Sequence, residues 1–371
     1  MHINALSQMP RLAYRHPLVA KTILTKSSRN LVHSVERCTL AGKSLPPRSV
    51  HLMMTDICNL RCHMCQYAYS ESPEYQLNRH GHMAPEVLRE IVRTVPGSPV
   101  FALSGGEPLL HPQIESLISE IKRRDLVCTL TTNGWLLEKK AESICDSDLD
   151  VLIVSIDGPK NLHDTIRGKG SFARAIDGIK RVLSRNRRPI VCISTTISDL
   201  NFGQLEAVYD LADDLGVDAY NINHLWFQTD EMTAQQMSSP QATTKGRVLW
   251  QLNPFDIDPE VVYQSLQKIR AKNSHMLFNE LPRLNGEETR IYYHNPGQLV
   301  KVNETRCAWL VMRIWPNGDV RLCRESVAGN VQIQPLNKIW NNDRYLKFRR
   351  VLAKRGTFPI CNRCCHLFPR V

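Results

Sequence analysis

Short apolar runs alternate with amphipathic stretches from residue 50 to residue 223, and this alternation constrains the fold more than any other feature of the chain. Strand-like runs lie at 50–56, 100–104, 127–132, 151–156, 190–197 and 217–223. Helix-like stretches separate them at 84–94, 112–124, 136–145, 171–185 and 202–215. Strands and helices that alternate in this way form a parallel sheet with right-handed crossovers. The sequence therefore predicts an α/β fold with its working residues at the C-terminal strand ends.

Three cysteines follow the first predicted strand. Cys58, Cys62 and Cys65 have the spacing C-x3-C-x2-C. Three thiolates can bind one four-iron cluster and leave its fourth iron without a protein ligand, open for chemistry. A structural zinc site is the alternative, with His63 as a further ligand, because C-x2-C also occurs there. Zinc sites usually take a second ligand pair at a similar spacing, and the neighbouring sequence does not supply one cleanly.

This spacing and its flanking residues resemble the radical S-adenosylmethionine (SAM) superfamily. The resemblance implies a partial (βα)6 TIM-like barrel, open on one side for the substrate, and a 4Fe-4S cluster whose open iron binds the methionine part of SAM. It also implies the reaction, in which one electron from the cluster cleaves SAM to methionine and a 5'-deoxyadenosyl radical that abstracts a hydrogen atom from the substrate. Met64, just before Cys65, would lie against the adenine, where many relatives have an aromatic residue.

A pair of glycines lies just after the second predicted strand. Gly105, Gly106 and Glu107 follow the apolar run 100–103. Glycines let the backbone approach a ligand closely, and the segment resembles the Gly-Gly-Glu motif of the superfamily. In isolation the tetrapeptide with Pro108 is more often a turn. In this position, the resemblance implies that the backbone and Glu107 hold the ammonium group of SAM.

Small polar residues end the third and fourth predicted strands as well. Asn133 follows the third strand, and Ser155 and Asp157 end the fourth. The resemblance implies that Asn133 belongs to the SAM site and that Ser155 and Asp157 reach the ribose or the methionine part of SAM. Arg167 matches a position that approaches the SAM carboxylate in similar enzymes, and a surface arginine is the alternative there.

A second cysteine pattern occupies the C-terminal part of the chain. Cys307, Gly318 and Cys323 are followed by the closing cysteines at 361, 364 and 365, in the pattern C-x10-G-x4-C…C-x2-C. This resembles the start of the SPASM auxiliary-cluster domain and its shorter relative, the twitch domain. A full SPASM domain has seven cysteines and two clusters, whereas five cysteines follow residue 300 here. We expect one auxiliary 4Fe-4S cluster, and a four-cysteine zinc ribbon is the alternative. The expected ligands are Cys307, Cys323, Cys361 and Cys364, with Cys365 as the competitor of Cys364.

Four other cysteines lack metal-like spacing, and burial in the core is the default for them. They are Cys38, Cys128, Cys145 and Cys192. Cys128 and Cys192 lie on predicted strands and could line the barrel, where one of them would return a hydrogen atom to a product radical if the reaction were redox-neutral, as in similar epimerases. Twelve cysteines with this spacing indicate clusters in a reducing compartment rather than a disulfide framework.

The chain has 371 residues, enough for one large core and a smaller satellite. The expected domains are a basic N-terminal extension at 1–49, the core barrel at 50–225, an insertion or linker at 226–300 that shapes the active site, and the auxiliary-cluster domain at 301–371. The stretch 225–300 reads as mostly irregular, with one helix near 259–273. No apolar run is long enough to span a membrane and no signal peptide is evident, so we expect a cytoplasmic protein.

The net charge of +11 is unevenly distributed. Residues 1–50 carry +7 and residues 338–371 carry +8, which leaves the middle of the chain at −4. A basic surface suits an acidic electron donor such as a flavodoxin or ferredoxin. An apolar stripe from Leu18 to Val35, opposed by basic residues, could instead lie on an anionic membrane, but such a helix more often packs on its own domain. Nucleic acid is not an expected partner, because the basic ends lack interleaved aromatic residues.

The sequence thus predicts a radical SAM enzyme of the oxidoreductase type that oxidises or cross-links a small molecule, lipid or sugar. Maturation of a ribosomal peptide and redox-neutral epimerisation are the alternatives within the class. A hypothesis from another class is a non-catalytic iron–sulfur electron carrier or a zinc-stabilised binding protein, which would bind its metal but not SAM. The intact Gly105, Gly106 and Glu107 argue against that last hypothesis.

Overall fold

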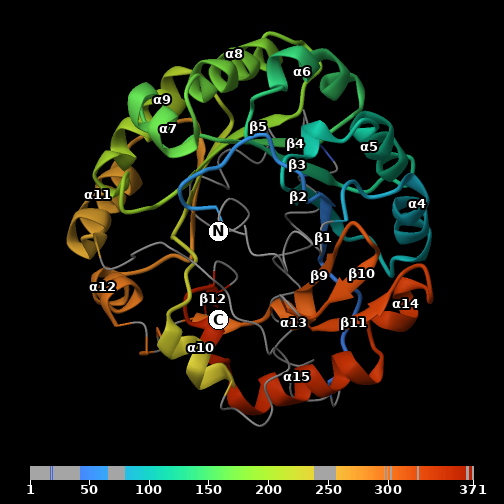
Figure 1. The fold of residues 1–371 in the computed structure, drawn as a ribbon. Coiled ribbons are helices and arrows are strands. Elements are labelled where there is room, and N and C mark those ends of the chain that lie inside the picture. Colours follow the sequence, from blue (N-terminus) through green and yellow to red (C-terminus); the bar gives the residue numbers. More distant parts are fainter. Residues whose placement is uncertain are drawn as a thin grey trace.

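A curved sheet with helices on its outer side forms the body of the protein (Figure 1). This computed structural model describes residues 17, 19, 42–65, 80–237, 256–295, 297–298, 300, 303–323, 326–364 and 367–369. The strands are neighbours in the order β11-β10-β9-β1-β2-β3-β4-β5-β6-β7. Pairing is parallel from β9 through β1 to β7. The α/β fold with a parallel sheet is therefore confirmed.

All six predicted strands are present, with bounds within two residues of the expected ones. They are β1 (Ser49–Thr55), β2 (Val100–Gly105), β3 (Cys128–Thr132), β4 (Val151–Ser155), β5 (Ile190–Thr196) and β6 (Ala219–Asn223). Side chains alternate between the two faces of the sheet. On β4, Leu152 and Val154 are completely buried in the core, whereas Ile153 and Ser155 are partly exposed on the inner face. The inner face is therefore the side available for a site.

The five predicted helices are also present. They are α4 (Pro85–Thr94), α5 (Ile114–Lys122), α6 (Leu137–Asp146), α8 (Ser171–Leu183) and α9 (Leu205–Asp214), with the short turns η1 (Pro108–Leu110) and η2 (Phe202–Gln204) before α5 and α9. Each of the five helices buries an apolar stripe in the core. An additional helix, α7 (Lys160–Arg167), follows β4 and carries Arg167 at its last position.

The expectation that 225–300 is mostly irregular is wrong for its described part. The helix near 259–273 is confirmed as α11 (Pro259–Ala271), but α10 (Asp230–Met237), β7 (Leu277–Leu281) and α12 (Gly286–His294) are regular elements as well. β7 pairs in parallel with β6, so the sheet continues beyond the six predicted βα units. The cause is a pattern too short and too polar to be recognised, since β7 reads Leu-Phe-Asn-Glu-Leu.

The C-terminal part of the chain joins the same sheet at β1. β9 (Val311–Ile314) pairs in parallel with β1, and β10 (Asp319–Arg321) and β11 (Val327–Asn330) continue from it in antiparallel pairing. A separate two-stranded sheet contains β8 (Asn303–Thr305) and β12 (Leu367–Pro369). The remaining elements are α13 (Cys307–Leu310), α14 (Leu336–Ile339), α15 (Asp343–Arg355) and η4 (Pro359–Cys361). The division into four domains stays a prediction.

The N-terminal segment is described only at residues 17 and 19 and from residue 42 onward. Val19 is buried against Val100, Val127 and Ile190, which lie at the N-terminal ends of β2, β3 and β5. The rest of the predicted apolar stripe lies outside the described residues. No helix within the described ranges is long and apolar enough to cross a membrane.

Candidate functional site

The cysteine loop leaves the C-terminal end of β1. Cys62 is buried, and Cys58 and Cys65 are partly exposed. Two contacts hold the loop against neighbouring segments: the His63 backbone N–H donates to the carbonyl of Ile166 in helix 160–167 at 2.8 Å, and the His63 ring Nε2 lies 3.1 Å from the carboxylate of Asp199 in the loop after β5. The structure thus brings the three thiols together at the predicted edge of the sheet.

The three thiols lie close enough to influence one another's charge. Burial raises the pKa of Cys58, and the charges of Glu107 and Cys65 raise it further. Burial likewise raises the pKa of Cys62, partly offset by the Arg167 guanidinium. Metal ligation requires the thiolate form, which burial disfavours. A bound metal cation would supply the positive charge that stabilises the thiolates. No three His, Cys, Asp or Glu side chains in the described ranges have the spacing of a single-ion site, and a four-iron cluster separates its thiolates more widely because each binds a different iron.

The glycine pair packs against the start of this cysteine loop. A Cβ on Gly106 would stand 2.6 Å from the carbonyl carbon of Ile57, and a Cβ on Gly105 would stand 3.2 Å from the Thr55 nitrogen. Backbone hydrogen bonds join the same segments, from Gly106 N–H to Thr55 at 2.7 Å and from Glu107 N–H to Ile57 at 2.8 Å. The glycines therefore admit the backbone of the loop that carries the cysteines.

Glu107 is 1% exposed and its carboxylate is held by three donors. Oε1 accepts from the Leu109 N–H at 2.9 Å and the Thr132 hydroxyl at 2.7 Å, and Oε2 accepts from the Asn133 N–H at 2.7 Å. Burial raises the pKa of Glu107, while these hydrogen bonds oppose that change. In the described structure Glu107 thus fixes the end of β3, and its contact with the SAM ammonium stays a prediction.

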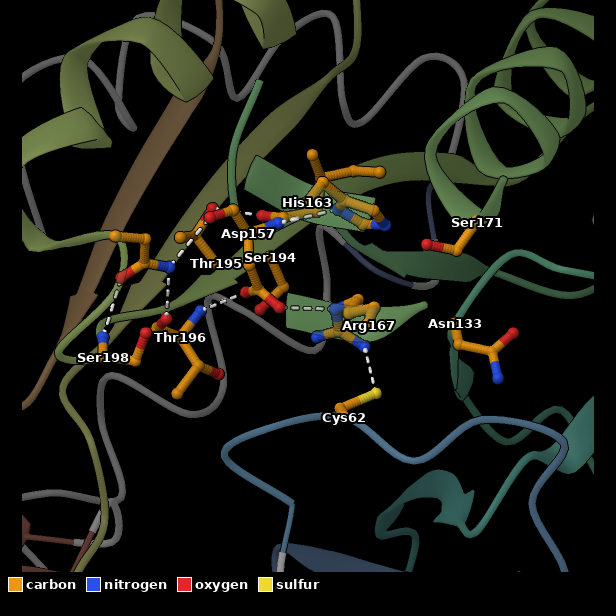
Figure 2. Close-up of polar contacts among 12 residues, drawn as sticks. Cys62, Asn133, Asp157, His163, Arg167, Ser171, Ser194, Thr195, Thr196 and Ser198 are labelled. Atoms are coloured by element: carbon orange, nitrogen blue, oxygen red, sulfur yellow. Dashed lines mark hydrogen bonds and ion pairs between the residues drawn. The ribbon is translucent and has the colours of Figure 1, made fainter. Parts of the chain in front are cut away.

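Arg167 reaches from α7 to the cysteine loop (Figure 2). Its Nε pairs with the Asp157 carboxylate, and its terminal nitrogen lies 3.8 Å from the Cys62 sulfur. Asp157 is fully buried, and its other carboxylate oxygen accepts from the Thr196 N–H at 2.9 Å. Burial favours the neutral form of Arg167, but the charge of Asp157 outweighs it and raises the pKa of the guanidinium. The structure thus contradicts the surface-arginine alternative, because Arg167 is 11% exposed.

Two buried residues that sequence reasoning missed support Asp157. His163 accepts a hydrogen bond from the Asp157 N–H through Nδ1 at 3.2 Å, and the Asn201 amide donates to the Asp157 carbonyl at 2.9 Å. Burial lowers the pKa of His163 to about 4, so the ring is neutral near pH 7. His163 precedes Arg167 by four residues, one turn of α7, and this spacing was the available signal.

The remaining predicted SAM residues surround the same loop. The Asn133 amide donates to the Asn59 side chain at 3.0 Å and lies 3.9 Å from the Cys58 sulfur. Met64 is 8% exposed and belongs to the main core. Ser155 lies on the inner face at the end of β4. The contacts of these residues with SAM stay predictions.

Hydroxyl and amide side chains form a row across the inner face. Ser155 on β4 pairs in register with Ser194 on β5, which pairs with Asn221 on β6, which pairs with Asn279 on β7. The amide of Asn223 donates to the Ser194 hydroxyl at 2.9 Å. This neutral polar row lies on the inner face of the sheet and runs across β4, β5, β6 and β7.

The two strand cysteines point in different directions. Cys128 is completely buried in the main core, on the opposite face from the partly exposed Thr129 and Thr131. The expectation that Cys128 lines the barrel is therefore wrong. Cys192 shares the inner face with Ser194 because the two are separated by one residue on β5.

The predicted auxiliary cysteines also come together. Burial raises the pKa of Cys307 to about 11, with further contributions from Cys364 and Cys323. Burial raises the pKa of Cys361 too, and the charges of Cys323, Cys307 and Cys364 add to it. The four thiols therefore lie near one another, and their role as ligands of one cluster stays a prediction. Cys365, the alternative ligand, and Cys38 lie outside the described residues.

A parallel α/β barrel with three cysteines at the end of its first strand defines a class of cluster-dependent proteins, and the family models agree with it. Residues 52–212 match the radical SAM superfamily, and residues 306–365 match SPASM, an iron–sulfur cluster-binding domain. The chain belongs to the radical SAM superfamily and carries a C-terminal SPASM domain. Membership implies a 4Fe-4S cluster, SAM and auxiliary iron–sulfur binding.

Relatives and solved structures resemble most of the chain. An AdoMet-dependent heme synthase of Methanosarcina barkeri is 28% identical over 326 residues, which cover 85% of this chain and 88% of the relative. A GTP 3',8-cyclase of Peptoclostridium acidaminophilum is 26% identical over 295 residues, covering 75% of this chain and 80% of the relative. The structure of Streptococcus suis SuiB bound to S-adenosylmethionine aligns with a TM-score of 0.62 at 15% identity, over 92% of this chain and 77% of that one. This structural likeness shows the fold alone.

Proposed function

We propose that Cys58, Cys62 and Cys65 hold the SAM-cleaving 4Fe-4S cluster of this enzyme. When bound, the cluster and SAM supply the 5'-deoxyadenosyl radical that abstracts a hydrogen atom from the substrate. The observation that carries the proposal is the arrangement of the loop, with three thiols at the end of β1 and the Arg167 guanidinium 3.8 Å from Cys62. Asp157 orients that guanidinium, so a cation faces the anionic site.

The polar residues around the loop are proposed to hold SAM. Arg167 is held in place by its ion pair with Asp157, which uses the Nε of the guanidinium. The terminal nitrogens of the same guanidinium can therefore donate to the SAM carboxylate. Glu107 orders the backbone at Asn133. The proposed SAM contacts are Met64, Gly105, Gly106, Glu107, Asn133, Ser155, Asp157 and Arg167.

Cys307, Cys323, Cys361 and Cys364 are proposed to hold one auxiliary 4Fe-4S cluster. Four mutually influencing thiols from α13, the end of β10 and the η4 loop support this assignment. A four-cysteine zinc site is the alternative. Only a redox-active group there would accept an electron from a substrate radical, so the choice of metal decides whether net oxidation is possible at this site.

The proposed reaction is oxidation or cross-linking of a non-peptide substrate, catalysed by an oxidoreductase. The two relatives above support a non-peptide substrate, since their names describe chemistry on small molecules. The neutral row Ser155, Ser194, Asn221 and Asn279 suits a substrate that offers hydroxyl, amide or carbonyl groups. A lysine or arginine substitution within this row, such as Asn279→Lys, is expected to raise KM more than it lowers the rate of SAM cleavage.

The proposed electron donor is an acidic carrier such as a flavodoxin or ferredoxin. Arg344, Lys347 and Lys354 are exposed on one side of α15, and the inner side of the same helix packs beside Cys307 through Arg349. Reversing the charge of Lys347 and Lys354 is expected to slow reduction by the carrier about tenfold at low salt. Dithionite-driven SAM cleavage should stay unchanged, and an equal slowing with both reductants would contradict this docking surface.

Redox-neutral epimerisation is a second candidate, favoured by Cys192. Its thiol lies on the inner face, and burial raises its pKa to about 12, so it stays protonated near pH 7. A hydrogen atom donor needs this S–H bond. Cys192→Ala would abolish epimerisation while leaving hydrogen abstraction intact, whereas an oxidation would proceed normally in the same variant.

The experiment that tests the proposal uses the full chain reconstituted without oxygen. Iron and zinc per chain are measured first, and 5'-deoxyadenosine is then measured after addition of SAM and dithionite. About eight irons with slow 5'-deoxyadenosine formation support both clusters. About four irons with one zinc would retain the radical chemistry and exclude the auxiliary electron acceptor. Intact clusters without SAM cleavage would favour a non-catalytic carrier.

A further inference from the structure

A buried arginine lies within the last auxiliary cysteine pair. Arg363 is located between Cys361 and Cys364 in the sequence, and its side chain is completely buried. Its guanidinium donates to backbone carbonyls at 2.6 Å from both Ile291 and Asn295. The full set of accepting carbonyls comprises Ile291, Tyr292, Asn295, Gln298 and Asn362. The side chain therefore leaves the cysteine loop and binds a different element.

That element is the C-terminal end of α12 (Gly286–His294). The last carbonyls of a helix have no hydrogen-bond donor within the helix, and they form the negative end of its dipole. A guanidinium at this end donates hydrogen bonds to the carbonyls and its positive charge interacts favourably with the dipole. Arg363 also lies over the ring of Tyr292, with 5.2 Å from the guanidinium carbon to the ring centroid. The cysteine loop thus supplies the C-terminal cap of a helix that packs on the barrel through α11.

Tyr292 ties the same loop to the end of β6. Its hydroxyl lies 2.9 Å from the Leu225 carbonyl and 3.1 Å from the Arg363 carbonyl. His224, next to Leu225, packs its ring 5.4 Å from that of Tyr292. Three segments therefore meet at one point: the cysteine loop, α12 and the chain leaving β6.

The charge of Arg363 is not matched by a carboxylate in the described part of the chain. The guanidinium of an arginine keeps its proton throughout the physiological pH range. A buried cation that meets only dipoles is costly. A 4Fe-4S cluster with four thiolate ligands has a net negative charge, and charge near such a cluster adjusts its potential.

We propose that Arg363 is a positioning residue for the auxiliary cluster: it anchors the Cys361 and Cys364 loop to α12, and it places a buried positive charge on the residue next to Cys364. This inference rests on the proposed ligand assignment. It predicts that retention of the auxiliary cluster depends on the positive charge of Arg363. It also predicts that the geometry of the cysteine loop depends on the planar guanidinium, whose several N–H donors lysine cannot reproduce.

The test compares Arg363→Gln, Arg363→Lys and the control Arg89→Gln in the anaerobically reconstituted full chain. Arg89 is on α4, is 57% exposed and makes one surface ion pair. Iron per chain, the fraction of reduced auxiliary cluster at a fixed potential, and SAM cleavage without substrate are measured. In Arg363→Gln we expect about four irons instead of about eight. Any auxiliary cluster that it retains should show a tenfold smaller reduced fraction, about 59 mV for one electron. SAM cleavage should stay within about twofold of wild type because the Cys58 loop is separate.

Arg363→Lys keeps the charge and should retain about eight irons, with faster hydrogen exchange at the last turn of α12. If Arg363→Gln does not fold, the Arg363→Lys variant alone tests whether the guanidinium anchors the cysteine loop. Arg363→Gln with the iron content and reduced fraction of wild type, or Arg363→Lys with unchanged exchange, would overturn the inference. A wild-type chain with about four irons would refute the auxiliary cluster itself, which is a separate failure.

Discussion

Replacing Gly106 by alanine tests how the structure builds the cysteine loop. The added Cβ would stand 2.6 Å from the carbonyl carbon of Ile57 and 3.1 Å from that of Asp56, and closer still to the Ile57 oxygen. These are backbone atoms just before Cys58, so no side chain can rotate out of the way. Gly106 is not among the glycines with positive φ, so the conflict is purely steric.

The expected magnitude follows from what must move. Overpacking of this kind costs about 1–3 kcal/mol. Displacing the loop also weakens the hydrogen bonds from Gly106 N–H to Thr55 and from Glu107 N–H to Ile57, each worth about 1 kcal/mol. Together these effects amount to about 3–5 kcal/mol. The strain lies between the glycine pair and the cysteine loop. We therefore expect it to displace mainly the three thiols that this loop carries.

The assay combines urea unfolding of the metal-free chain with iron content and 5'-deoxyadenosine formation after reconstitution. Gly203→Ala is the matched control, since a Cβ at Gly203 would meet nothing within 4 Å and its φ is ordinary. Gly106→Ala should lower the urea midpoint, lose about four irons and abolish SAM cleavage, whereas the control should match wild type. If Gly106→Ala cleaves SAM at the rate of the control, the steric reasoning is refuted.

Three further variants test separate parts of the site. Asp157→Asn removes the partner of the buried Arg167, which should cost about 3–5 kcal/mol and weaken SAM binding, and unchanged SAM affinity by equilibrium dialysis would contradict the proposed role. Burial opposes ionisation of Glu280, but its contacts with His224 and then Arg270 lower its pKa below 4.5. Its stabilisation is therefore present above that pH and lost as the pH falls. Glu280→Gln should therefore flatten the acid side of a stability-versus-pH curve, measured by thermal unfolding at pH 3 to 7. Cys192→Ala should leave both iron content and SAM cleavage unchanged, and loss of either would show that the thiol has a structural role.

The repetitive part of the fold was predictable because each unit carries its own signal. In β4, fully buried Leu152 and Val154 alternate with Ile153 and Ser155, and α8 carries an apolar stripe of its own. β7 carried no such signal, since its five residues include Asn279 and Glu280. Its place in the sheet depends on pairing with β6, which no local pattern encodes.

The start of α12 shows a signal that was present but not used. Asn285 accepts from the Glu288 N–H while the Glu288 carboxylate accepts from the Asn285 N–H, which is a capping box readable as Asn-x-x-Glu. At the site, the sequence spacing located the cysteines, but it did not locate the residues that hold Asp157 and the cysteine loop in place. His163 comes from α7, whereas Asp199 and Asn201 come from the loop after β5, and only the folded chain brings them to Asp157 and the cysteine loop.

The pairing of β9 with β1 connects the two cysteine sites physically. β1 ends in the loop that carries Cys58, and β9 begins four residues after Cys307, at the end of α13. Their register pairs Ser49 with Val311 and Leu52 with Ile314, so the two strands cannot slide without losing both the ladder and the burial of Leu52, Met312 and Ile314. One parallel ladder thus fixes the position of Cys307 relative to the strand that leads into the Cys58 loop. The sheet, rather than a flexible linker, holds these two parts of the chain in register.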